Sequence, residues 1–186
     1  MKKKVFITGL TLIIAVFIVL SSTVNSKNAG SFKYVGVSKC VTCHKTDAQG
    51  KQQDIWKNSG HSQAWKTLLT EAADKIAKDK GFNTKASETP QCIKCHVLGK
   101  DIVPEELTES FSKEDGVQCE SCHGPGSEYK ALSIMKDKQK SIENGLNPIS
   151  DKNQLCVSCH NPESPTYKEF KFDEMWEKIK HYKPKN

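Results

Sequence analysis

The sequence of 186 residues predicts a mainly α-helical fold with much irregular chain. Apolar residues recur at helical spacing in several short stretches, and glycine, proline and polar residues separate these stretches. Hydrophobic residues make up 36% of the chain, and many of them lie in the first 26 residues, so few are left to build a protein core. We therefore expect a fold that condenses around bound groups.

A five-residue pattern, C-x-x-C-H, occurs four times and contains every cysteine of the chain: Cys40, Cys43, Cys92, Cys95, Cys119, Cys122, Cys156 and Cys159. The histidines that close the four motifs are His44, His96, His123 and His160. This pattern attaches c-type haem, because one turn of chain places two thiols where each can form a thioether with a haem vinyl group. The next residue then points its imidazole at the iron. The sequence thus predicts four covalently attached haem c groups and a multihaem cytochrome c fold organised around them.

Two other uses of paired cysteines are open on spacing alone. C-x-x-C pairs also bind zinc, and an even number of cysteines in an exported chain suits structural disulfides. Neither use requires a histidine directly after all four pairs, in a chain that has 6 histidines in total. Covalent haem is therefore the preferred interpretation.

The N-terminal stretch has the composition of an export signal. Three lysines precede an apolar run over residues 5–20, and small and polar residues follow. We expect a signal peptide over residues 1–26 with cleavage after Ser26, and an uncleaved N-terminal membrane anchor is the alternative. Either would place residues 27–186, as a single tetrahaem domain, in the periplasm or otherwise outside the cytoplasmic membrane, where c-type haem is attached.

The charge pattern argues against nucleic acid as a partner. The formal net charge of +6 includes the three lysines of the N-terminal segment, and haem propionates would lower the total further. The chain contains no arginine, which nucleic-acid-binding proteins use for base edges and phosphates, and its lysines are scattered. We expect redox partner proteins, a donor and an acceptor, and membrane contact only if the N-terminal segment is uncleaved.

The elements expected along the chain are short. A strand or extended lead-in over 32–37 precedes the first motif. Helices are predicted over 47–58, 59–81, 127–145 and 172–182. Ser59 is expected to cap the second of these helices and Gly81 to stop it. The second motif lies in polar chain between Pro90 and Pro104, and the third runs directly into a Gly-Pro-Gly turn.

Counting histidines shows a shortage of axial ligands. Each haem iron takes the histidine of its own motif, so only His61 and His181 remain for four distal positions. Both lie on predicted apolar helical faces, and we expect both as distal ligands. At most two irons can then carry two histidines, and the others need methionine, another donor or no sixth ligand.

Two methionines lie outside the N-terminal segment, Met135 and Met175. Met135 follows the third motif on a predicted short helix and is a candidate sixth ligand, whereas Met175 is expected to pack in the core. Methionine ligation raises the reduction potential of a haem relative to ligation by histidine alone. Irons of both kinds would therefore span a range of potentials.

Three longer strings resemble the cytochrome c-554 family of tetrahaem periplasmic cytochromes. They are W-x4-H-x2-A after the first motif (Trp56, His61, Ala64), GVQCESCHGPGS around the third motif and KFDEMWEKIKHYK near the C-terminus. The resemblance covers nearly all of residues 27–186. It implies an electron carrier, of the kind that accepts electrons from hydroxylamine oxidoreductase in ammonia oxidisers, with its porphyrins in close stacked and perpendicular pairs.

The resemblance also implies a ligand set. In the family three haems have two histidines and the second haem is five-coordinate, so His61 would be the distal ligand of the fourth haem and His181 that of the third. His96 would hold the iron with the open position. The family's first haem takes a distal histidine from the segment after the Gly-Pro-Gly turn, where this chain has only Tyr129, Ser133 and Met135. The first haem is then either ligated by Met135 or a second open site.

Electron transfer along four haems is the leading interpretation. The alternative is an enzyme that converts nitric oxide or another nitrogen oxide at an open iron. Such chemistry usually needs a positioned proton donor, but both spare histidines are used as ligands and the nearby acids lie in surface-like stretches. We therefore assign no catalytic residue. A haem-based sensor is least favoured, because we find no output domain in the sequence.

Overall fold

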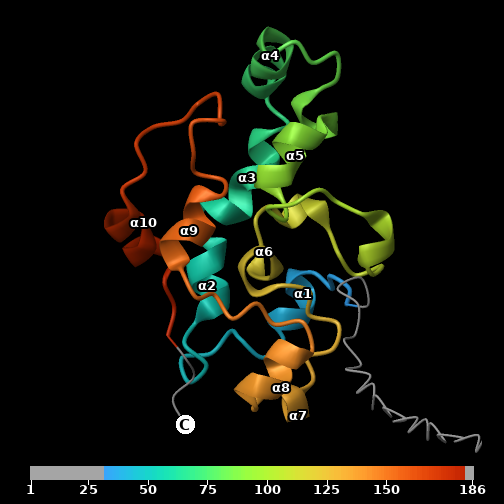
Figure 1. Ribbon diagram of the computed structural model, residues 1–186, viewed down its shortest axis with the longest axis vertical. Coiled ribbons are helices and arrows are strands. Elements are labelled where there is room, and N and C mark those ends of the chain that lie inside the picture. The colour runs from blue at the N-terminus through green and yellow to red at the C-terminus, as the bar shows by residue number, and fades with distance from the viewer. Residues whose placement is uncertain (1–31, 183–186) are drawn as a thin grey trace, which may run out of the picture.

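Short helices joined by irregular chain make up residues 32–182, which are the residues that the computed structural model describes (Figure 1). The α-helices are α1 (Val37–Cys40), α2 (Gln52–Lys57), α3 (Ala64–Thr67), α4 (Glu71–Asp79), α5 (Pro90–His96), α6 (Cys119–His123), α7 (Leu132–Met135), α8 (Lys138–Glu143), α9 (Lys152–Val157) and α10 (Phe172–Ile179). Single 3₁₀ turns form η2 (Gly60–Gln63), η3 (Ala86–Glu88), η4 (Pro104–Glu106) and η5 (Lys113–Asp115).

The mainly helical, largely irregular fold that the sequence predicts is confirmed. Within residues 32–182 the extended lead-in contributes only an isolated parallel bridge, between Tyr34 and Leu107. No helix in this part of the chain is long and apolar enough to cross a membrane. The predicted signal segment, residues 1–26, lies outside the described residues.

The helix predicted over 59–81 is broken into η2, α3 and α4. Ser59 does not cap it, because its hydroxyl donates to a backbone carbonyl of the preceding turn. The break lies before Thr70, whose hydroxyl accepts a hydrogen bond from the N–H of Ala73 and so starts α4 as a new helix. The stop at Gly81 is confirmed, since α4 ends at Asp79 and Gly81 follows the last turn.

The other predicted helices are shorter than expected for similar reasons. The chain over 44–51 forms turns, so the predicted helix 47–58 is reduced to α2. Asp137 caps α8 through its carboxylate and thereby splits the predicted helix 127–145 into α7 and α8. In the C-terminal element α10 ends at Ile179, so His181 lies in extended chain beyond the helix.

The protein core is small and lies around α3, α4 and α5, in the upper part of Figure 1. It contains Tyr34, Trp65, Leu68, Ala73, Ala77, Ala86, Val97 and Leu98. The expectation that Met175 packs in the core is wrong, because its side chain is 39% exposed and its sulfur contacts the amine of Lys178. The reason is the position of α10 at the edge of the molecule, where none of its residues is buried (Figure 1).

One buried carboxylate connects the first motif with the third. Glu120 is 2% exposed, and it accepts hydrogen bonds from the backbone N–H groups of Val35, Gly36 and Gly126 at 2.7–3.0 Å. Val35 and Gly36 lead into α1, Glu120 belongs to α6, and Gly126 ends the Gly-Pro-Gly turn. Because α1 and α6 pack against each other, this carboxylate fixes the two motifs side by side.

We predict that Glu120→Gln lowers the free energy of unfolding by about 2–4 kcal/mol, because an amide NH₂ group would then face buried N–H donors. Chemical denaturation followed by circular dichroism measures this loss. The control is Glu105→Gln, which alters an exposed acid and should change the free energy of unfolding by less than about 0.5 kcal/mol. Equal losses in the two variants would show that the Glu120 carboxylate has no special structural role.

Candidate haem sites

Each cysteine motif occupies one helical turn. The second and third motifs lie entirely within α5 and α6. The first begins at the last residue of α1 and the fourth begins within α9. Both continue as turns, in which the N–H groups of His44 and His160 donate to the carbonyls of Cys40 and Cys156 at 3.2 and 3.0 Å. This is the local geometry expected of a haem attachment site.

The eight motif cysteines form no disulfides with one another. All eight lie within residues 32–182, and all are free thiols. In the same part of the chain, no three histidine, cysteine, aspartate or glutamate side chains converge as a metal site. Neither a structural disulfide nor a zinc cluster, the two other uses of paired cysteines, is therefore observed there.

Two pairs of histidines face each other at a distance that fits an iron between them. The ring centres of His61 and His160 are 6.0 Å apart, and those of His123 and His181 are 5.8 Å apart. Imidazoles that bind opposite sides of one iron through bonds of about 2 Å have their centres roughly 6 Å apart. The residues present therefore fit haem iron at the third and fourth motifs.

The surroundings of these imidazoles favour the neutral form that binds metals. Burial lowers the pKa of His61, and the nearby His160 lowers it further. Burial likewise lowers the pKa of His123 to about 4, with smaller contributions from His181 and His44. A ring with such a pKa is uncharged at neutral pH and keeps a free lone pair.

The imidazoles of the first and second motifs have no histidine opposite them. All six histidines are described, and the two pairs use four of them. Nδ1 of His96 lies 2.7 Å from the carbonyl oxygen of Ala64 and donates to it, which leaves Nε2 free for iron. Burial lowers the pKa of His44, while the neighbouring side chain of Gln52 acts in the opposite direction.

The three side chains expected as possible ligands after the Gly-Pro-Gly turn differ in availability. The hydroxyl of Tyr129 donates to the carbonyl of Gly124 at 3.0 Å, and burial raises the pKa of Tyr129 above its usual range. Ser133 is exposed. Met135 is half-buried at the end of α7, which packs against α8. Ligation by Met135 stays a prediction.

Thiols from different motifs lie next to one another. The Cys119 thiol lies beside that of Cys40 and, more than burial, raises the pKa of Cys40. Burial raises the pKa of Cys95 to about 11, and the neighbouring Cys159 thiol adds to the effect. Burial also raises the pKa of Cys122 to about 11, with the fourth-motif cysteines as its next neighbours. Cysteines of the third motif are thus close to those of the first and fourth motifs, and a fourth-motif cysteine is close to one of the second. The hydroxyl of Ser121 in the third motif also donates to the carbonyl of Val97, directly after the second motif, at 2.6 Å.

Three side chains near the motifs were not identified from the sequence. Phe170 stacks on the imidazole of His160, with ring centres 4.7 Å apart, and fixes its plane. Gln52 lies against His44, and Glu120 supports the first and third motifs. Only Glu120 gave a signal that could have been used, because it is an acidic residue inside a motif that must lie close to buried haem.

Comparisons with known proteins find similar c-type cytochromes. A protein-family model described as "Cytochrome c554 and c-prime" matches residues 39–124. The chain is 29% identical over 190 residues to cytochrome c-554 of Nitrosomonas europaea, an alignment that covers 83% of this chain and 78% of the relative. The structure of reduced cytochrome c554 from the same organism is similar, with a TM-score of 0.53 and 24% identity, over 82% of this chain and 85% of that one. At that identity the structural likeness shows the fold alone.

We predict that His61→Ala and His181→Ala each convert one low-spin iron to high spin, because each removes one imidazole of a facing pair. Electron paramagnetic resonance of the oxidised protein counts the irons of each kind, and the double variant should show the sum of the two changes. The control is Gln63→Ala, at an exposed position next to His61 in η2. A spectrum unchanged by either histidine substitution would remove that histidine from the set of ligands.

Proposed function

We propose that this chain, which is similar to cytochrome c-554 and matches the cytochrome c554 family model over residues 39–124, carries four covalent haems and passes electrons between redox partner proteins outside the cytoplasm. When bound, haem supplies an iron that gains and loses one electron. The observation that supports the proposal most is that the attachment motifs neighbour one another. We arrange them as a row, first, third, fourth and second, because cysteines of these successive motifs influence each other's pKa.

The residues of the chain would hold this row in place in three ways. The eight motif cysteines bind the porphyrin edges, and the four motif histidines bind the irons from one side. The carboxylate of Glu120 keeps α1 against α6, and with them the first motif against the third. For electron transfer, the protein mainly has to fix the positions of the haems, supply suitable axial ligands and control the electrostatic environment.

The axial ligands divide the row into a middle and two ends. We assign His61 and His160 to the fourth iron and His123 and His181 to the third, in accord with their facing rings. These are the two middle positions. The two end positions have one histidine each, His44 at the first motif and His96 at the second.

The two ends also differ from each other. At the first motif Met135 is the remaining donor, because the phenol of Tyr129 is already hydrogen-bonded and Ser133 is exposed. Methionine in place of histidine would raise the potential of that iron. At the second motif His96 stands alone, and its iron would be open to a small external ligand.

The setting of the protein follows from the N-terminal segment and the surface. Residues 1–26 would direct export, so the haem domain is proposed to work in the periplasm. The exposed lysines, which are scattered along the sequence, would give weak contacts to exchangeable redox partners.

We predict four haems per polypeptide. Mass spectrometry of the intact purified protein should show the mass of four covalent haem groups, and a haem assay in alkaline pyridine should give the same ratio. Replacing Cys92 and Cys95 together by alanine should lower the count to three, because only the second motif then lacks its thiols. A ratio well below four in the unmodified protein would contradict the proposal.

We predict that the ferrous protein binds carbon monoxide at one iron, the one held by His96, and that Met135→Leu raises the number to two. The reason is that removal of the thioether opens the first iron. Titration followed by visible absorption counts the bound ligand. The chain offers a matched control in Met175→Leu, which alters an exposed methionine and should leave the number at one. If both variants bind as the unmodified protein does, Met135 is not a ligand.

A further inference from the structure

Gln52, the first residue of α2, lies between two of the proposed iron ligands. Its amide nitrogen donates to the carbonyl oxygen of Tyr182 at 3.1 Å, across 130 positions of the chain. Tyr182 directly follows His181, which faces His123 of the third motif. On its other side, the Gln52 side chain lies beside the imidazole of His44 in the first motif, with its oxygen Oε1 buried and unpaired within the described residues. One amide thus touches the ligand of one haem and the chain segment that carries the ligand of the next.

The segment with His181 has few other supports. Helix α10 ends at Ile179, Lys180 is extended, and the side chains of His181 and Tyr182 are exposed. Within residues 32–182, the bond from Gln52 is the one hydrogen bond that joins 180–182 to a distant part of the chain. The position of the His181 imidazole therefore depends strongly on this contact.

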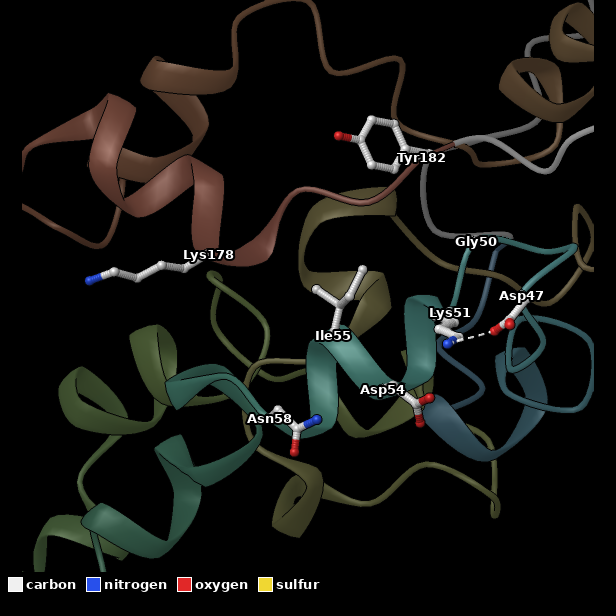
Figure 2. A pocket seen from close by; sticks show the side chains of 8 residues that line it. All are labelled: Asp47, Gly50, Lys51, Asp54, Ile55, Asn58, Lys178 and Tyr182. Carbon is white, nitrogen blue, oxygen red and sulfur yellow. Dashed lines mark ion pairs between the residues drawn. The ribbon is translucent and has the colours of Figure 1, made fainter.

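At Gly50, near Gln52, the backbone allows the C-terminal segment to approach closely. Gly50 has φ of +94°, and a Cβ atom there would lie 2.7 Å from the carbonyl oxygen of Tyr182. Only glycine allows this close approach. Figure 2 shows Gly50 and Tyr182 on facing segments, at one end of a cavity of about 520 Å³ that is also lined by Ile55 and Lys178. Beside that cavity the crossing at Gly50 and Gln52 brings the two segments into contact.

The oxygen of the Gln52 amide is suited to accept a hydrogen bond from an iron-bound histidine. The Gln52 carbonyl oxygen Oε1 is buried and finds no partner at full hydrogen-bond geometry, and the imidazole of His44 is beside it. A histidine that binds iron through one ring nitrogen carries a proton on the other, which needs an acceptor. His96 uses the carbonyl of Ala64 for this purpose. Oε1 of Gln52 is the corresponding acceptor for His44.

We propose that Gln52 is a positioning residue that orients His44 at the first iron and, through Tyr182, holds His181 at the third iron. The inference rests on the proposed function, since it takes both histidines as axial ligands. It goes further in making the ligands of two neighbouring irons depend on one side chain. Loss of the amide should loosen His181 without touching the pair formed by His61 and His160.

The test is Gln52→Leu, which keeps the approximate size of the side chain and removes both the donor to Tyr182 and the acceptor beside His44. We expect electron paramagnetic resonance of the oxidised holoprotein to show up to one additional high-spin iron, at the expense of the low-spin signal that His181→Ala also removes. Added imidazole should restore the low-spin signal in both variants, because it can occupy the position that His181 has left. The neighbouring Gln53→Leu is the matched control, as no hydrogen bond is formed by its side chain, and it should leave the spectrum unchanged.

A second variant distinguishes the contact of the amide with Tyr182 from its contact with His44. Gln52→Glu keeps an acceptor for His44 but cannot donate to Tyr182, so it should still loosen His181 while leaving the first iron unaltered. A Gln52→Leu protein with four haems and the spectrum of the unmodified protein would overturn the inference. So would an equal effect of Gln53→Leu, or a high-spin signal that imidazole does not reverse. A haem count below four in the unmodified protein would instead refute the proposed function.

Discussion

The buried carboxylate of Glu120 is the contact on which the relative position of the first and third motifs depends. A carboxylate that is 2% exposed is costly to bury, and three backbone N–H groups offset that cost here. Two of these groups lead into α1 and the third closes the turn after α6. In a chain with so small an apolar core, polar contacts of this kind hold elements that hydrophobic packing alone would leave loosely placed.

The histidine pairs give the molecule its functional asymmetry. The third and fourth motifs each have a second imidazole about 6 Å away, while the first and second do not. Cysteines of the third and fourth motifs each neighbour cysteines of two other motifs, so in the proposed row the irons with two histidines would lie in the middle. An iron with two histidines keeps its ligands on oxidation and reduction, which suits a relay position. The chemically distinct irons would face the two ends, where partners or small ligands arrive.

The sequence was informative where chemistry depends on spacing and weak where it depends on distant contacts. The four motifs and the helical character could be predicted, because both depend on residues that are close together in the sequence. Helix lengths were overestimated, because Thr70 and Asp137 form local caps that interrupt otherwise continuous apolar patterns. The roles of Gln52 and Phe170 had no local signal, since their partners lie 130 residues away in one case and in a separate loop in the other. Met175 was misplaced because a helical apolar face does not reveal whether protein covers it.

The side-by-side thiols of Cys40 and Cys119 have a consequence for how the protein is assembled. In an oxidising compartment, two free thiols held next to each other can join as a disulfide, and a thiol lost in this way can no longer bond to a vinyl group. The native packing of α1 on α6 would therefore be harmful to a chain that still lacks its haems. Under the proposed function, attachment of haem before α1 packs on α6 would protect both thiols from this loss.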